Sequence, residues 1–479
     1  MHLSTLNFIP SFPFLFSFIL VVSCLGSEND YHSEKHFSER DRTFFDVLMD
    51  DYRKMFNGDT MVCHDICENP LRYANTYTPY SVIANLTTAP YEFEGCHPVK
   101  LWLLIRHGSR TMDSNTRQAS SKILPRIRHH ILYSHMIGKG DLDEQTVELF
   151  KNWTENLPLD NQKSLTMIGE EEMYNLAVRT RERHPHFFKS NYSELQHEFR
   201  SSIKQRTKDS AIHFARGLFP DELYKVRFES SKKDDQILRF HTRCRQWVKS
   251  VERNSSTYHQ LDEFLSSPTM AEALIRISYR LGLNYTLDYS EAKLMLRYCA
   301  SQSAWDGHDS PWCHVFSDQE LKIIDHADDI RRYYLHSYPH EINYKQACPL
   351  VRAMLKFLGT TNPEDGFKSR FLFSHSGSML KFITAMGLFE EKSNLSEHNW
   401  QNKTWRGSFI DAFASNYAAI LYKCSDNVDK VLTLYQEQPM ILRNCDSILC
   451  PLAVIQDTYK AYMDCNFDKI CRNRKRKND

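Results

Sequence analysis

The feature that most constrains the fold is an apolar run that ends in a cationic loop. Residues 101–105 are apolar, and Arg106-His107-Gly108-Ser109-Arg110-Thr111 follows directly. Such a run predicts a buried strand, and a glycine just after it lets the backbone approach a neighbouring segment closely. Arginine forks match phosphate oxygens, and a histidine held among them can attack phosphorus. The positive charges of Arg106 and Arg110 should lower the pKa of His107 and favour its neutral, nucleophilic ring. An ordinary basic loop could carry the same string, so the rest of the chain must decide.

Two further segments repeat the order of strand, polar end and helix. The strand pattern at 197–200 leads into Arg206 and a strongly periodic helix, and the strand pattern at 370–374 ends at His375 before another helix. In open α/β sheets, ligands gather at the carboxyl ends of the strands. We therefore expect the three segments to build one phosphate site. The predicted set is Arg106, His107, Arg110, Arg206 and His375.

The order of the patterns predicts an α/β fold with a helical insertion. Strands and helices alternate over residues 96–221 and again over 367–465, where 417–422 and 431–435 read as an antiparallel hairpin. Residues 222–366 show successive helical patterns and no clear strand. The predicted fold class is an α/β sheet domain flanked by helices, with an inserted all-α cap domain at 222–366.

Residues 1–26 have the character of a secretory signal peptide. Residues 8–25 are nearly all apolar, and the small residues around position 26 allow cleavage. The basic region that normally precedes such a run is missing, so a retained signal anchor in the membrane is the alternative. No second apolar run of spanning length follows. We expect residues 27–95 to form a surface segment and 466–479 to form a basic tail without an ER-retention signal.

Cysteines and glycosylation sequons point to the same compartment. Without Cys24, twelve cysteines remain, an even number that predicts disulfide bonds but leaves their pairing open. Cys63-His64-x-x-Cys67 looks like half a zinc site, but no second ligand pair lies nearby, so no metal site is expected. The chain is expected to be a secreted or lumenal glycoprotein. The sequons lie at Asn85, Asn152, Asn191, Asn254, Asn284, Asn394 and Asn402.

The charge balance restricts the classes of partner. Lys and Arg number 60, and Asp and Glu also number 60, so no net charge recruits nucleic acid or a membrane surface. An anion site must therefore come from a local concentration of arginine. The expected partner is a small phosphorylated molecule.

The ordered motifs resemble the histidine acid phosphatases and, within them, the multiple inositol polyphosphate phosphatases. Residues 106–110 match the family's Arg-His-Gly-x-Arg motif, and Leu165-Thr166-x-x-Gly169 looks like its Leu-Thr-x-x-Gly element. Residues 199–219 are similar to the segment with the third phosphate arginine, and residues 373–375 to the strand with the second histidine. The resemblance runs, with gaps, over most of the chain, and four motifs in order are far more specific than any one.

The resemblance implies a phosphoglycerate-mutase-like sheet domain and hydrolysis of the phosphomonoesters of inositol polyphosphates, without metal or organic cofactor. His107 would attack phosphorus and form a phosphohistidine, and His375 would donate to the phosphate oxygens. Arg200 would contact a neighbouring substrate phosphate or support the site, with a structural ion pair as the alternative. The arginines expected to hold the phosphate are Arg106, Arg110 and Arg206.

The chain departs from the family at the residue that would protonate the leaving group. Gly377 stands where the resemblance calls for a carboxylate, and general acids typically contribute roughly 10²–10⁴-fold in rate. Met112 stands where related enzymes often have proline, which matters less because that residue shapes a loop. Another acid, or a water held by Ser376 or Ser378, could replace the missing carboxylate.

The departure at Gly377 leaves several functions open. The chain could be a slow phosphatase, or a phosphatase-like protein that binds phosphorylated ligands without turnover. A structural or receptor glycoprotein is a third class, although it does not explain five clustered cationic and imidazole side chains. Phosphorylated glycerates are the alternative substrates to inositol polyphosphates.

Overall fold

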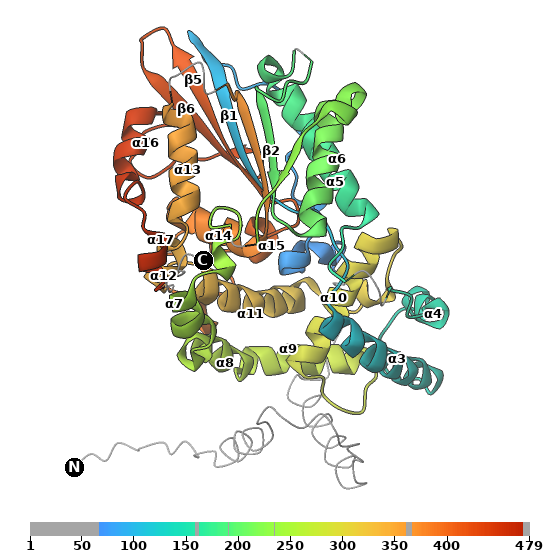
Figure 1. The fold of residues 1–479 in the computed structure, drawn as a ribbon. Coiled ribbons are helices and arrows are strands. Elements are labelled where there is room, and N and C mark those ends of the chain that lie inside the picture. The colour runs from blue at the N-terminus through green and yellow to red at the C-terminus, as the bar shows by residue number, and fades with distance from the viewer. Residues whose placement is uncertain (1–66, 159–161, 190, 234, 361–365, 473–479) are drawn as a thin grey trace, which may run out of the picture. The chain divides into compact units, whose positions relative to one another are not determined.

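The computed structural model describes residues 67–158, 162–189, 191–233, 235–360 and 366–472 (Figure 1). The predicted signal peptide and the first part of the predicted surface segment, up to residue 66, lie outside the described residues, as do Cys63 and His64 of the half zinc site.

One mixed sheet organises the described part of the chain. The eight strands follow the order β3-β2-β4-β1-β5-β6-β7, with β8 paired to β6. The strands are β1 (Cys96–Arg106), β2 (His197–Ser201), β3 (Phe228–Ser230), β4 (Ser369–Ser374), β5 (Asn416–Cys424), β6 (Asp429–Tyr435), β7 (Gln438–Pro439) and β8 (Leu449–Pro451). The strands β1 to β4 run parallel to one another, whereas β5 pairs antiparallel with both β1 and β6. The predicted α/β fold and the predicted hairpin are confirmed.

The register places the ends of the two central strands side by side. Arg106 is opposite Ser374, and the His107 amide donates to the Ser374 carbonyl at 3.2 Å. The Ser202 amide donates to the Phe373 carbonyl, so β2 ends at the same edge. The three segments predicted to converge therefore meet because parallel strands share a carboxyl edge.

Side chains of β1 alternate between two cores, as the period of two in a strand requires. Leu101, Leu103 and Ile105 pack with the aromatic side chains of β4 and helix α6, whereas Trp102 and Leu104 face the larger core beneath α13 and α14. Residues on both faces are buried, which is why the sequence shows a continuous apolar run rather than an alternating one.

Helices cover both faces of the sheet (Figure 1). α5 and α6 lie on one face and α13 and α16 on the other, and α14 follows β4 directly. The main helices are α3 (Ser114–Met136), α4 (Glu144–Asn152), α5 (Met167–Arg183), α6 (Gln205–Leu218), α8 (His259–Leu265), α9 (Pro268–Arg280), α10 (Tyr289–Asp306), α11 (Asp318–His336), α13 (Cys348–Gly359), α14 (Ser376–Ala385) and α16 (Leu452–Thr458). Short helices are α7 (Arg245–Trp247), α12 (Glu341–Lys345), α15 (Gly407–Ile410) and α17 (Phe467–Ile470).

The predicted all-α cap at 222–366 needs correction. β3 lies inside this range and pairs parallel with β2, and it was missed because three exposed residues give no apolar pattern. α13, at the end of the range, packs against β1 and so covers the sheet. The helices α8 to α11 do gather beyond the carboxyl edge of the strands, but α3 and α4 join them there (Figure 1).

Two predicted terminal segments are also partly wrong. Within the predicted surface segment 27–95, Ala74 to Tyr80 are buried, and Asn75 donates to the buried carboxylates of Asp325 and Asp329. The predicted tail 466–479 begins with α17, whose Phe467 is buried, so only its later part lies outside the described residues.

Five disulfide bonds confirm the prediction from the cysteine count. The pairs are Cys96–Cys424, Cys244–Cys471, Cys299–Cys313, Cys348–Cys465 and Cys445–Cys450. Cys67 is not in a disulfide. None of the helices in the described ranges is long and apolar enough to cross a membrane.

Candidate active site

Two glycines lock the loop after β1 in place. A Cβ on Gly108 would lie 2.4 Å from the Gly169 carbonyl oxygen, and a Cβ on Gly169 would lie 2.2 Å from the Ser109 carbonyl oxygen. The backbones of the two motifs are therefore in direct contact, and only glycine fits at either position. Thr166 completes the contact by donating its amide and its hydroxyl to the Ser109 carbonyl. The Leu-Thr-x-x-Gly element thus supports the histidine loop.

Glu172 holds the same loop from the first turns of α5. Its carboxylate accepts from the Ser109 amide and hydroxyl, at 2.7 and 2.9 Å, and from the Tyr80 amide at 2.7 Å. Burial raises the pKa of Glu172 to about 7, although these hydrogen bonds oppose the shift. The side chain is a support for the loop and was not identified from the sequence.

His107 is buried at the centre of the site with one ring nitrogen engaged. Its Nδ1 contacts the Gly108 carbonyl at 2.9 Å, and because a carbonyl only accepts, the proton sits on Nδ1. The other nitrogen, Nε2, then carries the lone pair. Burial, followed by the charges of Arg206 and Arg106, holds the pKa of His107 well below its usual value. The ring is therefore neutral, with its lone pair on Nε2.

Arg106 is fixed from behind by a buried carboxylate. Its guanidinium donates to the carbonyl of Asp411 and to the carbonyl of Thr76, and it lies over the Phe413 ring with its carbon 4.6 Å from the centroid. Asp411 Oδ1 lies 3.4 Å from Arg106, and Asp411 Oδ2 accepts from Arg332 at 2.8 Å. Burial lowers the pKa of Arg106 to about 10, so it remains charged.

Arg206 and His375 meet beside His107. Arg206 Nη2 lies 3.3 Å from His375 Nδ1, and the rings of His375 and His107 have centroids 5.6 Å apart. A guanidinium only donates, so His375 Nδ1 accepts, and His375 Nε2 donates to Ser202 at 2.8 Å. Burial lowers the pKa of Arg206 to about 9 and holds that of His375 well below its usual value. His375 would donate to a phosphate only after gaining a proton on Nδ1.

Arg110 approaches the site across an aromatic ring. Its guanidinium carbon lies 5.3 Å from the centroid of Tyr77, and its Nη1 donates to the Thr111 carbonyl at 2.8 Å. Tyr77 packs against Phe413 with ring centroids 5.9 Å apart, and the Phe413 centroid lies 6.0 Å from that of His107, so Arg110 lies on the same side of the site. All five residues predicted to converge therefore do so.

Arg200 lies elsewhere. Its guanidinium donates to Asp235 at 2.7 Å, and the Asp235 carboxylate accepts from the amides of Ile237 and Leu238. Arg200 therefore forms a structural ion pair, the alternative role given for it above. Asp235 in turn shapes the start of the segment that leads to residue 241.

Several residues at the site gave no sequence signal. Asp411, Tyr77, Arg239 and Arg332 come from segments without a recognisable motif, and each reaches the site only through the tertiary fold. Among the described residues, the Nε atoms of Arg106, Arg206 and Arg239 are buried without a hydrogen-bond partner. Buried cationic donors of this kind suit an anion with several acceptor oxygens.

Both serines beside Gly377 have their hydroxyl protons engaged. Ser376 donates to Asp411 Oδ2 at 2.7 Å, and Ser378 donates to the Leu238 carbonyl at 3.0 Å. The space beside Gly377 is filled by His241, since a Cβ on Gly377 would lie 2.9 Å from His241 Cδ2.

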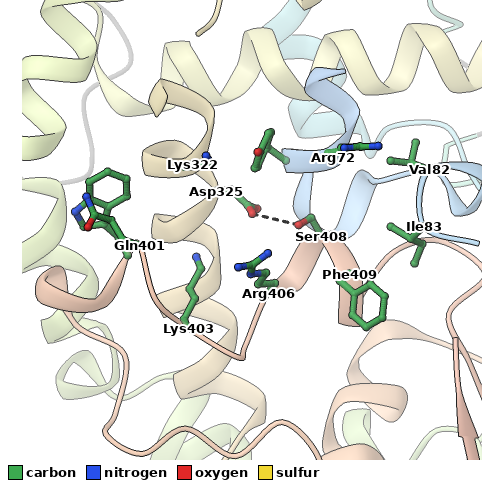
Figure 2. Close-up of a pocket in the computed structure, with 12 residues that line it drawn as sticks. Arg72, Val82, Ile83, Lys322, Asp325, Gln401, Lys403, Arg406, Ser408 and Phe409 are labelled. Carbon is green, nitrogen blue, oxygen red and sulfur yellow. Dashed lines mark hydrogen bonds between the residues drawn. The ribbon is translucent and has the colours of Figure 1, made fainter. Parts of the chain in front are cut away.

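A cavity of about 380 Å³ lies away from this site, between α11 and the segment 400–409 (Figure 2). Ser408 donates to Asp325 at 3.3 Å across it, and none of the predicted site residues line it. No group of three or more histidine, cysteine or acidic side chains that could hold a metal ion is found in the described ranges.

The seven sequons differ in exposure. Asn152, Asn191, Asn284, Asn394 and Asn402 are exposed, whereas Asn85 and Asn254 are half-buried. The amide of Asn85 donates to the Glu437 carbonyl and that of Asn254 to the Ser250 carbonyl. Glycosylation stays a prediction, and the five exposed positions favour it most.

The chain is similar to known phosphatases over most of its length. The family description "Histidine phosphatase superfamily (branch 2)" matches residues 100–436. Multiple inositol polyphosphate phosphatase 1 of Drosophila melanogaster is 27% identical over 434 residues, which cover 87% of this chain and 89% of the relative. The solved phytase of D. castellii superposes with a TM-score of 0.68 at 16% identity, over 85% of this chain and 88% of that one. The multiple inositol polyphosphate phosphatase of Bifidobacterium longum, solved with inositol hexasulfate, gives a TM-score of 0.62 at 16% identity, over 82% of this chain and 98% of that one.

Proposed function

The chain belongs to the histidine phosphatase superfamily (branch 2), and from this membership and the site geometry we propose that it hydrolyses phosphomonoesters of inositol polyphosphates through a phosphohistidine. The observation that carries the proposal is the environment of His107. A neutral imidazole with a free Nε2 lies among Arg106, Arg110 and Arg206, the arrangement that a phosphate dianion and an attacking nitrogen require.

The arginines bind and orient the phosphate. Their fixed positive charges neutralise its two negative charges, and they stabilise the charge that spreads over the three equatorial oxygens in the transition state. Arg106 is suited to this role because Asp411 and the Thr76 carbonyl hold its guanidinium rigidly. On binding, the Arg206 guanidinium would turn from His375 Nδ1 to the phosphate oxygens. His375 Nδ1 would then be free to take up a proton and donate it in a hydrogen bond to the phosphate.

The reaction then proceeds in two displacements. His107 Nε2 forms a bond to phosphorus as the ester oxygen leaves with a proton from an acid, releasing the alcohol. Water then attacks the phosphohistidine, the nitrogen–phosphorus bond breaks, and inorganic phosphate leaves as His107 returns to its neutral form. No metal ion is needed, because the arginines supply the positive charge.

A substrate with several phosphates fits the charge around the site. Besides the three phosphate arginines, Arg239, Arg297 and Arg332 bring positive charge to its walls, against the carboxylates of Asp411 and Asp328. The relatives named above act on, or were solved with, inositol rings bearing multiple anionic groups. Phosphorylated glycerates remain the alternative substrates.

The alternative function is binding without turnover. It is favoured by one observation, the absence of an acidic side chain at Gly377. A protein of this kind would retain the arginine cradle and lose the step that releases the alcohol.

The test is phosphate release from inositol hexakisphosphate by the purified chain. We expect wild type to release phosphate, His107→Ala to release none, and the exposed control Arg253→Ala to match wild type. Binding is measured on the same proteins by calorimetry, with Arg106→Ala expected to bind at least tenfold more weakly. No release together with binding that Arg106→Ala abolishes would support the binding protein instead. Neither release nor binding would exclude both functions.

We place the protein in the secretory pathway, secreted or lumenal. The five disulfide bonds support this placement, because such bonds persist in oxidising compartments. The segment that decides between a cleaved signal and a signal anchor lies outside the described residues. Mass spectrometry of the mature N-terminus and of deglycosylated peptides would test both predictions.

A further inference from the structure

Cleavage of an inositol phosphate needs a proton donor for the departing alkoxide. The oxygen-based groups nearest the site are engaged: Asp411 accepts on both oxygens, and Ser376 donates to it. Ser378 donates to the Leu238 carbonyl. The proton has to come from another group.

His241 occupies the position beside Gly377. It lies in a short helical turn, Phe240–Thr242, and its Cδ2 and Cγ atoms would be 2.9 and 3.3 Å from a Cβ built on Gly377. Its ring centroid is 5.8 Å from that of His375, which in turn is 5.6 Å from that of His107. The His375 ring is therefore close to both the His241 ring and the His107 ring.

The hydrogen bonds of His241 define which nitrogen is free. Ser378 Oγ lies 3.0 Å from the Leu238 carbonyl and 2.6 Å from His241 Nδ1. The carbonyl can only accept, so both contacts are satisfied when the hydroxyl donates to the carbonyl and accepts from Nδ1–H. Nδ1 is thereby fixed as a donor. His241 Nε2 has no hydrogen-bond partner among the described residues, and part of the residue remains exposed to solvent.

We propose that His241 is the general acid of this enzyme and that its Nε2 protonates the leaving oxygen in place of a carboxylate at position 377. The proposal rests on the proposed phosphatase function. A glycine at 377 is then required, because any side chain there would displace the imidazole.

The charges around His241 make its protonation depend on substrate. Burial, followed by the charge of Lys381 and that of Arg239, lowers the pKa of His241 to about 3, so the ring is neutral in the empty site. A bound phosphate dianion offsets these charges and raises the pKa, as does acidic pH. The groups that face His241 are Arg239 on its own segment, Arg206 on α6, His375 before α14, Lys381 on α14 and His336 on α11.

The proton balance closes over the two displacements. In the first, the His107 nitrogen–phosphorus bond forms, the phosphorus–oxygen ester bond breaks, and the His241 Nε2 proton goes to the departing oxygen. In the second, neutral His241 accepts a proton from the attacking water, the nitrogen–phosphorus bond breaks, and His241 is again protonated. The net reaction consumes one ester and one water and gives one alcohol and one phosphate.

The experiment compares two substrates that differ in their need for an acid. The leaving group of inositol hexakisphosphate is the alkoxide of an inositol pentakisphosphate, which requires a proton. The leaving group of 4-nitrophenyl phosphate is a stabilised phenolate, which does not. We expect His241→Asn to lower kcat on inositol hexakisphosphate by about 10²–10⁴-fold and kcat on 4-nitrophenyl phosphate by less than about fivefold. The half-buried His130→Gln on α3 serves as the matched control and should leave both rates unchanged.

The pH profile supplies a second readout. In wild type, kcat on inositol hexakisphosphate should fall as pH rises and the imidazolium of the complex loses its proton, while kcat on 4-nitrophenyl phosphate should not share this decline. In His241→Asn the two profiles should have the same shape. Thermal unfolding and phosphate binding show whether each variant is folded and retains the arginine cradle.

The outcomes separate this proposal from the proposed function. Equal activity of wild type and His241→Asn on both substrates overturns the role of His241 and leaves the phosphatase intact. Wild-type activity on 4-nitrophenyl phosphate alone also overturns it, because the site then lacks a working acid. Wild-type inactivity on both substrates overturns the proposed function itself. Equal loss on both substrates in a folded variant assigns His241 a positioning role instead.

Two further variants keep the test decisive. Gly377→Glu alone should be impaired, because its side chain meets the imidazole, whereas His241→Ala/Gly377→Glu should recover at least tenfold over His241→Ala on inositol hexakisphosphate. Tyr77→Phe tests another hydroxyl close to the site, since the Tyr77 ring lies against the Arg110 guanidinium. A leaving-group-dependent loss in Tyr77→Phe, without one in His241→Asn, would move the acid to the tyrosine.

Discussion

Substituting Gly108 with alanine tests whether the glycine pair positions the nucleophile. The added Cβ would lie 2.4 Å from the Gly169 carbonyl oxygen and 2.9 Å from the Gly169 Cα and carbonyl carbon. Every one of these atoms is backbone, so no side chain can rotate out of the way. Relieving the overlap means separating the two backbones by about 1.0 Å, because an ordinary contact of this kind begins at 3.4 Å.

The cost can be estimated in two ways. If the fold absorbs the overlap, overpacking between rigid backbones costs about 3 kcal/mol, at the upper end of its usual range, and lowers Tm by about 3–4 °C in a chain of this size. If the histidine loop moves instead, His107 shifts by about 1 Å, and misplacement on that scale costs about 10²-fold in rate. We expect both effects, with the loss of rate dominant because His107 is the residue next to the substituted glycine.

The assay is kcat/KM on 4-nitrophenyl phosphate, which needs no general acid, together with thermal unfolding. Gly169→Ala should show the same defect, because its Cβ would meet the Ser109 carbonyl oxygen across the same contact. The double variant should lose less than the sum of the two single losses, since the first substitution already separates the backbones. Gly138→Ala is the control: nothing lies within 4 Å of its Cβ, so it should cost about 1 kcal/mol for its left-handed backbone and no activity.

Wild-type kcat/KM and Tm in Gly108→Ala would refute the argument that backbone contact fixes the nucleophile. Additive losses in the double variant would show that the two glycines act separately.

Three other predictions follow from buried groups. Asp411→Asn removes the charge between two guanidiniums, so it should lower the free energy of unfolding by about 3 kcal/mol and weaken phosphate binding; unchanged calorimetry and melting would contradict this. The pKa of Glu172 is raised from 4.5 to about 7, so the contribution of its protonated form to stability is complete below pH 4.5 and is lost as pH rises through 7. Between these pH values the wild type should lose about 3 kcal/mol relative to Glu172→Gln, measured by denaturant unfolding, and parallel curves would exclude the effect. Removing the Cys244–Cys471 disulfide with two serines should cost about 2–5 kcal/mol, since it closes a loop of 227 residues, and equal denaturation midpoints would show that it does not contribute.

The sequence predicted those parts of the site whose signal is local. The apolar run 101–105 predicted β1, because a strand that is buried on both faces has no position for a polar side chain. The strand at 370–374 was recognisable for the same reason. The convergence of Arg106, Arg206 and His375 on His107 followed from one rule, that parallel strands share a carboxyl edge. These inferences needed only short stretches of chain and one topological principle.

The misplaced boundaries have local causes too. β3 is too short and exposed to produce a strand pattern, and residues 74–80 are polar or aromatic enough to look like surface. They are buried because Asn75 satisfies two buried carboxylates that lie some 250 positions later in the chain. A polar residue can be buried when a partner satisfies its hydrogen bonds. Here the partners are far away in the sequence, so the residues around Asn75 do not reveal its burial.

By itself, then, the sequence indicated the central strands of the sheet and the candidate set of Arg106, His107, Arg110, Arg206 and His375, because each part is encoded in a strand and the residues that follow it. It also marked Gly377 as the place where an acid is missing. Only the tertiary structure decided what stands there instead. His241 lies 136 positions earlier, in a turn without periodicity, and it reaches the site because Asp235 shapes that turn and Ser378 holds its ring. Contacts between segments so far apart depend on the packing of the whole fold, and packing is not encoded locally.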